Sequence, residues 1–267
     1  GGSAGLALAK RGAAKKIIGV GRSDSSLEAA KEVGAISEGT TNIREGVADA
    51  DFVLVATRVS VIGNQLEEID TCVRPGTPIT DAGSTKQSIV DRWEQSRSSR
   101  KGRFVGSHPL AGSHKRGPQA ADPALFEDKL TVLTPVESTP QSDTQSISAF
   151  WQLIGAQVCH LSPSEHDRLL ASASHAPHIV AAALAAATPR EAHRFTAGGW
   201  RDTTRIAAGD PDLWADILLD NAKAVTAQIE NFSQVSDQLQ HAIEEGDRPT
   251  LIKLLTLAKE SRDALGS

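Results

Sequence analysis

The sequence predicts an α/β protein in which a Rossmann-type, doubly wound parallel sheet is followed by an all-helical domain. As far as Pro135, short apolar runs typical of buried parallel strands alternate with amphipathic helical patterns. A glycine turn opens a helix at the start of the chain, and beyond Pro135 the pattern becomes mainly helical. Strands and helices that alternate at this spacing indicate βαβ units. We therefore expect a sheet domain over residues 1–135 and a mainly helical domain over 136–267.

The composition limits the class of protein. The chain has 267 residues and a net charge of -5 at pH 7, a length that fits one large domain or two of ordinary size. Mild acidity without a basic run argues against a nucleic-acid partner. Two cysteines, Cys72 and Cys159, do not make a disulfide framework and favour a reducing compartment. Because no apolar stretch approaches the roughly 20 residues that span a bilayer, and no signal peptide is recognised, we expect a cytoplasmic protein without a membrane partner.

The first residues indicate half of a dinucleotide-binding motif. Gly1, Gly2 and Ser3 lead into a small-residue helix that ends at Gly12, and residues 16–21 read as the next strand. A glycine-rich helix start followed by a strand is the second half of a βαβ nucleotide-binding unit, whose first strand and first glycines are missing here. We expect Gly1, Gly2 and Ser3 to bind cofactor phosphates. A Gly-Gly-Ser start is also typical of residues left by a cloning tag.

The residues at the end of that strand indicate whether the cofactor is NAD or NADP. NAD enzymes usually place an acidic residue here to bind the ribose, but this chain has Gly21 followed by Arg22, Ser23 and Ser25. Guanidinium and hydroxyl donors match the oxygens of a 2′-phosphate, which favours NADP. Asp24 is an alternative ribose ligand, which leaves NAD open. The same residues also read as a polar turn that caps a helix over 27–33.

Candidate residues lie at the carboxyl ends of three strands of the predicted sheet. Thr57 ends the apolar run 51–57, Gly83 and Ser84 follow 78–81, and His108 follows a strand at 103–105 that we expect to end in a loop at Gly106. Helices are expected over 60–68 and from Lys86 to about Ser98. Ligands bind outside the carboxyl ends of parallel strands, and histidine suits proton transfer near neutral pH. The alternative is a loop histidine without a role.

The second half begins with a clear helix start. Ser162 to Glu165 form a capping box with proline at the first helical position. The helix that follows contains His175 and His178 on one face, and we expect Pro177 to kink it. No third ligand at metal spacing accompanies the two histidines, so we expect no metal site. A packed structural pair is the alternative.

The last informative stretches lie between Gly198 and Leu239. Two glycines precede Arg201, Asp202 and Arg205, and arginine is suited to gripping a carboxylate, although most arginines are simply solvated or salt-bridged. Asp210 caps a helix whose apolar stripe runs from Leu218 to Leu239. Unbroken to Glu245, it is roughly 50 Å long by its rise per residue. That is too long for one subunit to cover, so we expect a homodimer. A last helix is expected over about 250–264.

Taken together, these stretches resemble one enzyme family, the prephenate/arogenate dehydrogenases of tyrosine biosynthesis. The resemblance covers nearly the whole chain in order. The matching stretches are Gly1–Ser3, Asp81–Lys86, Gly106–Ser113, Ala121–Pro123, Leu133–Pro135, Glu165–Asp167, Ser174–His178, Arg201–Arg205 and Asp210–Trp214. The chain departs from the family pattern at Arg58, where a proline is often found, and at His114, where many members have Glu.

The resemblance implies a reaction and roles for individual residues. It implies NAD(P)-dependent oxidative decarboxylation of prephenate to 4-hydroxyphenylpyruvate, of arogenate to tyrosine, or both, with hydride leaving C4 of the ring. His108 is then the proton acceptor for the C4 hydroxyl, Ser84 orients that hydroxyl and the histidine, and Arg205 binds the ring carboxylate. The remaining residues implied for the substrate pocket are Ser174, His175, His178, Asp202, Trp214 and, near its mouth, His114.

Two other functions are compatible with the same sequence. One is another two-domain hydroxy-acid dehydrogenase, since fold does not fix function. The other is a non-catalytic sensor of aromatic metabolites, although a sensor has no need of a proton acceptor such as His108. An assay of cofactor reduction with prephenate and with arogenate separates these readings.

Overall fold

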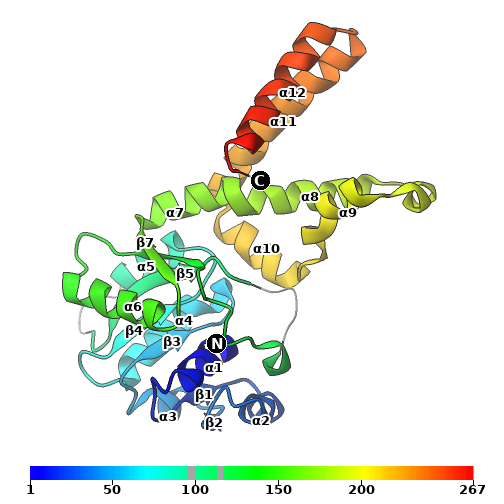
Figure 1. Ribbon diagram of the computed structural model, residues 1–267. Helices are drawn as coiled ribbons and strands as arrows, with labels where there is room; N and C mark the ends of the chain where they lie inside the picture. The colour runs from blue at the N-terminus through cyan, green and yellow to red at the C-terminus, as the bar shows by residue number, and fades with distance from the viewer. Residues whose placement is uncertain (96–99, 113–116, 267) are drawn as a thin grey trace. The chain divides into compact units, whose positions relative to one another are not determined.

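Among the residues that the structure describes, seven strands form two sheets, all in the first part of the chain. The computed structural model describes residues 1–95, 100–112 and 117–266, and divides into two compact units, Gly1–Asn221 and Ala222–Ser267. In the first unit β1 pairs with β2, and a second sheet has the order β3-β4-β5-β6-β7 (Figure 1). The strands are β1 Ile18–Val20, β2 Glu38–Thr40, β3 Val53–Val55, β4 Pro78–Asp81, β5 Arg103–Pro109, β6 Leu130–Thr134 and β7 Gln157–His160.

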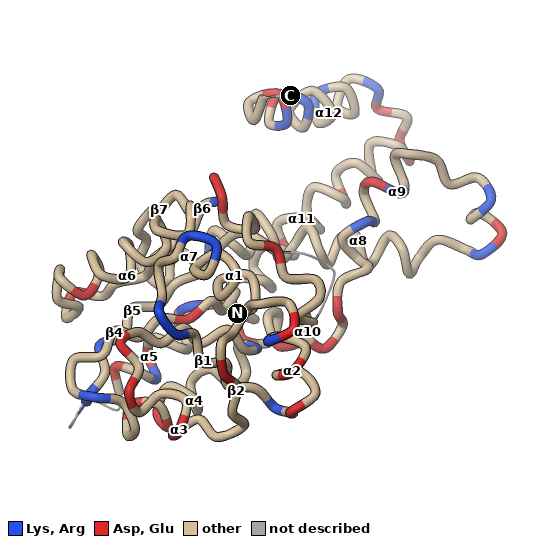
Figure 2. The backbone as a smooth tube through the Cα atoms, turned by 60° about the horizontal axis from the view of Figure 1, so that its bottom comes forward, with Lys and Arg blue, Asp and Glu red and all other residues tan. Residues whose placement is uncertain are grey.

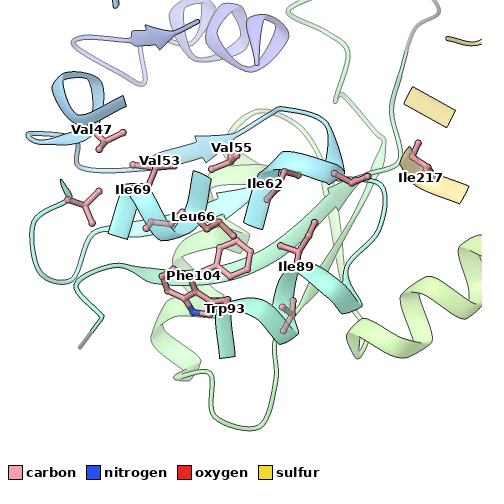
Figure 3. Close-up of a cluster of buried hydrophobic side chains, with 14 residues drawn as sticks. Val47, Val53, Val55, Ile62, Leu66, Ile69, Ile89, Trp93, Phe104 and Ile217 are labelled. Carbon is pink, nitrogen blue, oxygen red and sulfur yellow. The ribbon is translucent and has the colours of Figure 1, made fainter. Parts of the chain in front are cut away.

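Helices cover both faces of the larger sheet, as a doubly wound fold requires. In β3, Val53 and Val55 point to the face covered by α4 (Val59–Cys72) and α5 (Gln87–Gln95), where Ile62, Leu66 and Trp93 pack (Figure 3). Leu54 points to the opposite face, because successive strand side chains alternate. There α1 (Gly2–Lys10) and α6 (Gln141–Leu153) bury a second cluster around Trp151. The predicted α/β fold class is confirmed.

A groove separates the two sheets. It has a volume of about 1950 Å³ and is lined by residues of β1 and β3 as well as by the start of α1. β1 and β3 belong to different sheets, so neither strand pairs with the other across it. Beyond β1 the chain forms α2 (Asp24–Glu32) and α3 (Ile43–Val47), and Ser23 caps α2 by accepting from Ser26 N. β2 and α3, only three and five residues long, are not among the elements predicted from the sequence.

β5 is longer than the sequence suggested. The prediction that a loop starts at Gly106 is wrong, because the strand continues to Pro109 and His108 pairs with Val132. The reason is β6, which runs antiparallel to β5 and supplies partners for its last residues. Strands β3, β4 and β5 are parallel to one another, and β6 is parallel to β7. His108 is therefore held in the sheet rather than on a loop.

The sheet layer extends past the predicted domain boundary. α6 packs on the sheet, and β7 pairs with β6 from Gln157 to His160. The helical part then begins with α7 (Pro163–Leu170), whose start is the predicted capping box. The division at residue 135 remains a prediction, while the change from strands to helices lies between β7 and α7.

The helix predicted to contain His175 and His178 changes its winding before Pro177. Between α7 and α8 (Ala176–Ala187), residues Ala171–His175 form a π-helical turn. Pro177 has no N–H to donate to the preceding turn, which favours such an irregularity. Two 3₁₀ turns and two helices follow: Arg190–Phe195, α9 (Gly198–Thr204), Arg205–Ala208 and α10 (Pro211–Asp220).

The long helix expected from Pro211 to Glu245 is interrupted. Asn221 leaves the helical conformation and separates α10 from α11 (Ala222–Glu244). Its side chain is buried and bonded to other parts of the first unit, as described below, which gives the break its physical reason. The expectation of one unbroken helix is therefore wrong. In the second unit α11 ends at a turn in which Gly246 has a φ of +65°, and α12 (Arg248–Asp263) follows.

One helical run is long and apolar enough to cross a membrane by length and composition alone. It spans Pro163–Ala187, so the expectation that no stretch approaches that length is wrong by this measure. The same run carries His166 and Asp167, which are buried and hydrogen-bonded within the first unit. Along the rest of the chain, acidic and basic residues are interspersed rather than gathered on one element (Figure 2).

The close approach of α1 to the segment after α2 yields a stability prediction. A Cβ added to Gly5 lies 2.0 Å from the main-chain oxygen of Ala35, and Ala35 is fully buried. We expect Gly5→Ala to lower the free energy of unfolding by about 1–3 kcal/mol, as overpacking does. The measurement is denaturant unfolding beside Gly199→Ala, where the added Cβ meets open space. Equal midpoints for Gly5→Ala and the unchanged protein would contradict the prediction.

Candidate active site

A chain of hydrogen bonds starts at His108, near the carboxyl end of β5. His108 Nδ1 lies 2.9 Å from His166 Nε2, and His166 Nδ1 lies 2.8 Å from Asp167 Oδ1. His166 and Asp167 come from the first turns of α7 and are almost completely buried. The carboxylate of Asp167 in turn accepts from the backbone N–H groups of Lys86 at 2.8 Å and Gln87 at 2.9 Å. This series of hydrogen bonds thus connects the sheet, α7 and the start of α5.

Below His108 lies a buried ion pair. The ammonium of Lys86 has no exposed surface and donates to Asp81 Oδ2 and, at 2.9 Å, to the main-chain oxygen of Ser107. Burial lowers the pKa of Lys86, while the carboxylates of Asp81, Asp167 and Asp220 act to raise it. Asp81 also accepts from Ser107 N at 3.0 Å. The ion pair therefore ties the loop after β4 to β5.

The surroundings of His108 keep it neutral. Burial, followed by electrostatic interaction with His166, Lys86 and His175, lowers the pKa of His108 well below its ordinary value. A neutral imidazole has a lone pair on one nitrogen, so the group is a base throughout the neutral pH range. The side chain remains partly exposed, unlike those of His166 and Asp167.

His175 and His178 both contact Trp214 of α10. His178 stacks on the indole with ring centroids 3.6 Å apart, and His175 meets its edge at 6.2 Å. His175 Nδ1 also lies 3.2 Å from the amide nitrogen of Asn221. Burial lowers the pKa of His175 to about 4, against the opposing effect of Asp167, and burial also lowers the pKa of His178. Together with Trp214, these two neutral imidazole rings form an aromatic wall.

One buried polar atom of this wall has no partner. In the part of the chain that the structure describes, His178 Nδ1 is buried and makes no hydrogen bond. A buried polar atom without a partner is costly unless a ligand satisfies it. Ser174, partly exposed, precedes these histidines in the π-helical turn.

The other predicted pocket residues make fewer contacts with the rest of the site. Ser84 lies in the turn between β4 and α5, is partly exposed, and makes no hydrogen bond to His108 or to any other described residue. Arg205 and Asp202 are exposed, and Arg205 begins the 3₁₀ turn after α9. His114 lies outside the described residues. The structure thus joins His108 to His166 by a hydrogen bond and brings His175 and His178 into ring contact with Trp214. It shows no such contact for Ser84, Arg205 or Asp202 among the described residues.

Part of the predicted cofactor set lines the groove between the sheets. Gly1, Gly2 and Ser3 lie there at the start of α1, and Thr57 lies there after β3. The hydroxyl of Thr57 donates to Gln65 at 2.6 Å. The groove lining does not include four other predicted residues, namely Arg22, Ser23, Ser25 and Gly83. Of these, Gly83 N donates to Asp81 Oδ2 at 2.8 Å, within the loop that carries the ion pair.

The turn after β1 has an arginine free to bind a ligand. Arg22 is exposed and has no hydrogen bond or ion pair to the residues that the structure describes. Ser23 and Ser25 lie beside it with hydroxyl oxygens 3.2 Å apart. Arg58, which replaces the expected proline, lies 3.7 Å from Asp216 of α10, and Ser60 donates to the same carboxylate at 2.7 Å.

Sequence reasoning did not assign roles to four residues that organise the site. These residues are Asp81, Lys86, His166 and Asp167, which lie within the stretches that resemble the family but have no predicted role of their own. A local signal existed for two of them, because the capping box places His166 and Asp167 in the first turns of a helix. Their contacts join positions 58 and 81 residues apart, which no local pattern reveals.

Known families match the chain over almost its full length. The family model for the nucleotide-binding domain of prephenate dehydrogenase matches residues 4–160, and the model for its dimerization domain matches residues 162–257. A prephenate dehydrogenase of Bacillus subtilis is 38% identical over 272 residues, covering 99% of this chain and 73% of that protein. A cyclohexadienyl dehydrogenase of Zymomonas mobilis is 33% identical and covers 85% of this chain and 79% of its own.

Solved structures agree with these relatives. A prephenate dehydrogenase from Aquifex aeolicus, in complex with hydroxyphenyl propionate and NAD+, superposes with a TM-score of 0.89 at 31% identity, covering 99% of this chain and 94% of that chain. A Synechocystis arogenate dehydrogenase gives a TM-score of 0.83 at 29% identity over 99% of this chain and 96% of that chain. The chain therefore belongs to the prephenate/arogenate dehydrogenase family and is an oxidoreductase, the activity of that family being the oxidative decarboxylation of prephenate or arogenate with a nicotinamide cofactor.

Proposed function

We propose that His108 is the proton acceptor when this enzyme oxidatively decarboxylates prephenate, arogenate or both. The observation that supports this most strongly is its neutral imidazole, which is partly exposed, bonded through Nδ1, and located near the carboxyl end of a central strand. β3, β4 and β5 are parallel, so Thr57, Ser84 and His108 share one edge of the sheet. Ligands of doubly wound proteins bind at that edge.

The groove fits a dinucleotide. It is lined by backbone of the first residues of α1, and an added Cβ on Gly2 lies 3.2 Å from the side chain of Ala121, so a larger residue fits poorly. α1 is nine residues long, and a helix start with free N–H groups binds phosphate. We propose that Gly1, Gly2 and Ser3 contact the pyrophosphate, with Thr57 and Gly83 near the nicotinamide end.

The protein's part in the reaction is positioning and proton transfer. A nicotinamide held in the groove would supply the acceptor for the hydride that leaves C4 of the ring. His108 Nε2 accepts the proton of the C4 hydroxyl, while Ser84 orients that hydroxyl. Loss of the ring carboxylate as carbon dioxide needs no further acid or metal, because its electrons complete the aromatic ring. The gain of aromaticity drives the step, so the residues contribute orientation and charge complementarity.

The substrate is proposed to lie between β5 and the aromatic wall. Arg205, exposed and able to form paired hydrogen bonds, binds the ring carboxylate. The unpartnered His178 Nδ1 is a hydrogen-bonding site for the polar side chain of the substrate. Prephenate and arogenate differ only in that side chain, a keto acid in one and an amino acid in the other. The remaining residues proposed for this pocket are Ser174, His175, Asp202, Trp214 and, at its mouth, His114.

NADP is proposed to be preferred over NAD. Arg22 is exposed and unpaired among the described residues, and the hydroxyls of Ser23 and Ser25 lie beside it. Gly21, which lines the groove, provides no carboxylate to repel a 2′-phosphate. Asp24 opposes the preference if it binds the ribose.

The protein is proposed to work as a cytoplasmic homodimer. The family model for the helical half is that of a dimerization domain. In the second unit, apolar side chains of α11 and α12 are about half exposed, among them Phe232 at 45%, Val235 at 49% and Leu255 at 55%. Exposed apolar area of this extent is typical of a surface that a partner subunit covers.

The first prediction from the proposed function concerns His108. We expect His108→Asn to lower kcat by about 10²-fold or more, with the Kd of the cofactor nearly unchanged, because a positioned base is lost. In the unchanged enzyme, the low pKa of His108 keeps kcat/KM flat at neutral pH, and kcat/KM falls only in the acid range, where the imidazole becomes protonated.

Steady-state formation of reduced cofactor, with prephenate and with arogenate, is the measurement. His160→Asn, at an exposed histidine on β7, is the control and should behave as the unchanged enzyme. Turnover of His108→Asn close to that of the control would remove His108 from the mechanism. No reduced cofactor with either substrate would reject the proposed function itself.

The second prediction concerns the cofactor. A charge-assisted hydrogen bond contributes about 1.5–3 kcal/mol, so kcat/KM should favour NADP by roughly ten- to hundredfold. Arg22→Ala should remove most of that ratio. Lys31→Ala, near the other end of α2, is the control and should leave it unchanged. A preference for NAD in the unchanged enzyme, or an unaltered ratio in Arg22→Ala, contradicts the assignment of this turn to a 2′-phosphate.

The third prediction concerns assembly. We expect light scattering at micromolar concentration to give the mass of a dimer. Val235→Asp should raise the monomer fraction, because burial of a charge at an interface is unfavourable. Gln238→Asp introduces the same charge at an exposed polar position of α11 and serves as the control. A monomeric unchanged protein would refute the dimer.

A further inference from the structure

The environment of Asp167 determines the direction of the hydrogen bonds that end at His108. Asp167 Oδ1 accepts from Lys86 N and faces His166 Nδ1, while Oδ2 accepts from Gln87 N. Because both oxygens already accept backbone N–H groups, the side chain is a carboxylate that only accepts. His166 Nδ1 must therefore carry a proton and donate it to Oδ1.

The next bond follows from the first. In the neutral form of His166 the single N–H is the one on Nδ1, which leaves a lone pair on Nε2. That lone pair faces His108 Nδ1 at 2.9 Å, so Nδ1 of His108 is the donor. His108 then has its own lone pair on Nε2. This is the nitrogen that remains for the hydroxyl proton of a substrate.

Asp167 is anchored against rotation from several sides. Besides the two N–H groups at the start of α5, its main-chain oxygen accepts from the Asn221 amide at 2.7 Å. His166 has no exposed surface and Asp167 is 5% exposed. A carboxylate held in this way imposes its hydrogen-bond direction on the two rings, and water does not compete for the bonds.

We propose that His166 and Asp167 are positioning residues that hold His108 in the tautomer with its proton on Nδ1 and its base lone pair on Nε2. They touch neither substrate nor cofactor in this scheme. When His108 gains a proton, the hydrogen bonds through His166 connect the new positive charge to the Asp167 carboxylate. In catalytic triads, loss of a carboxylate that fixes the tautomer of a histidine base costs about 10⁴ in kcat. The inference rests on the proposed role of His108, and its first test is independent of turnover.

The first test reads the tautomer directly. Long-range ¹H–¹⁵N NMR of the full chain with ¹⁵N-labelled histidine separates the two ring nitrogens, and His108→Asn and His166→Gln assign the signals. We expect the neutral ring of His108 to be protonated on Nδ1, as that of His166 is. His160→Gln should leave both patterns unchanged. If neutral His108 is instead protonated on Nε2, the proposal is overturned, regardless of the turnover measured for the enzyme.

The second test uses a matched pair of variants. Glutamine can place its amide oxygen near the position of His166 Nε2, so His166→Gln retains an acceptor for His108, whereas His166→Leu has similar volume and none. We expect kcat of His166→Leu to fall at least about tenfold with KM little changed, and His166→Gln to recover much of the loss. Unfolding temperatures check that both variants are folded.

Equal kcat in the two folded variants would overturn the positioning role, since a purely structural contribution does not depend on the acceptor. Should either variant fail to fold, the tautomer measured in the unchanged protein decides the proposal alone. An unchanged enzyme that reduces cofactor with neither prephenate nor arogenate rejects the proposed function, while the NMR result still reports on the hydrogen-bond chain.

Discussion

A single buried positive charge organises the centre of this protein. Lys86 has no exposed surface, and its ammonium is held by Asp81 and by the main-chain oxygen of Ser107. Removing one partner of such a buried pair typically costs about 3–5 kcal/mol, because the other charge is left without compensation. Asp81 also binds Ser107 N and Gly83 N, so the same carboxylate shapes the loop after β4 and fixes the neighbouring strand.

The backbone of Lys86 makes a second contact that positions the site. Its N–H group binds Asp167, so the residue whose side chain supports β5 also fixes α7 against the start of α5. The Ser107 hydroxyl accepts from Trp151 Nε1 at 2.9 Å, which continues the network into the core on the other face of the sheet. A site assembled from β5, α7 and the start of α5 is thereby connected to the main core. The geometry around His108 depends on the fold as a whole rather than on a local loop.

The sequence predicted the parts of the molecule that local patterns control. A continuous apolar run placed β3, glycine and proline marked the helix ends, and the capping box at Ser162 was confirmed. The errors came from long-range contacts. β5 runs on through His108 because β6 pairs with it, and the helix after Pro211 breaks at Asn221 because that side chain is bonded to α7. The hydrogen-bond chain from His108 joins residues 58 positions apart, and only the folded structure reveals it.

The π-helical turn at Ala171–His175 has a consequence for how this site tolerates change in chain length. Such a turn contains one residue more than the surrounding α-helix, and one residue corresponds to a rotation of about 100° around the helix axis. The wide turn absorbs that residue locally, so Asp167 before it and the histidines after it stay aligned as in a helix one residue shorter. A further residue inserted into this run has no second wide turn to absorb it and would rotate the histidines of the aromatic wall relative to Asp167, away from Asn221 and Trp214. Length in this segment is therefore as strict a requirement as residue identity, whereas most surface loops accept insertions and deletions freely.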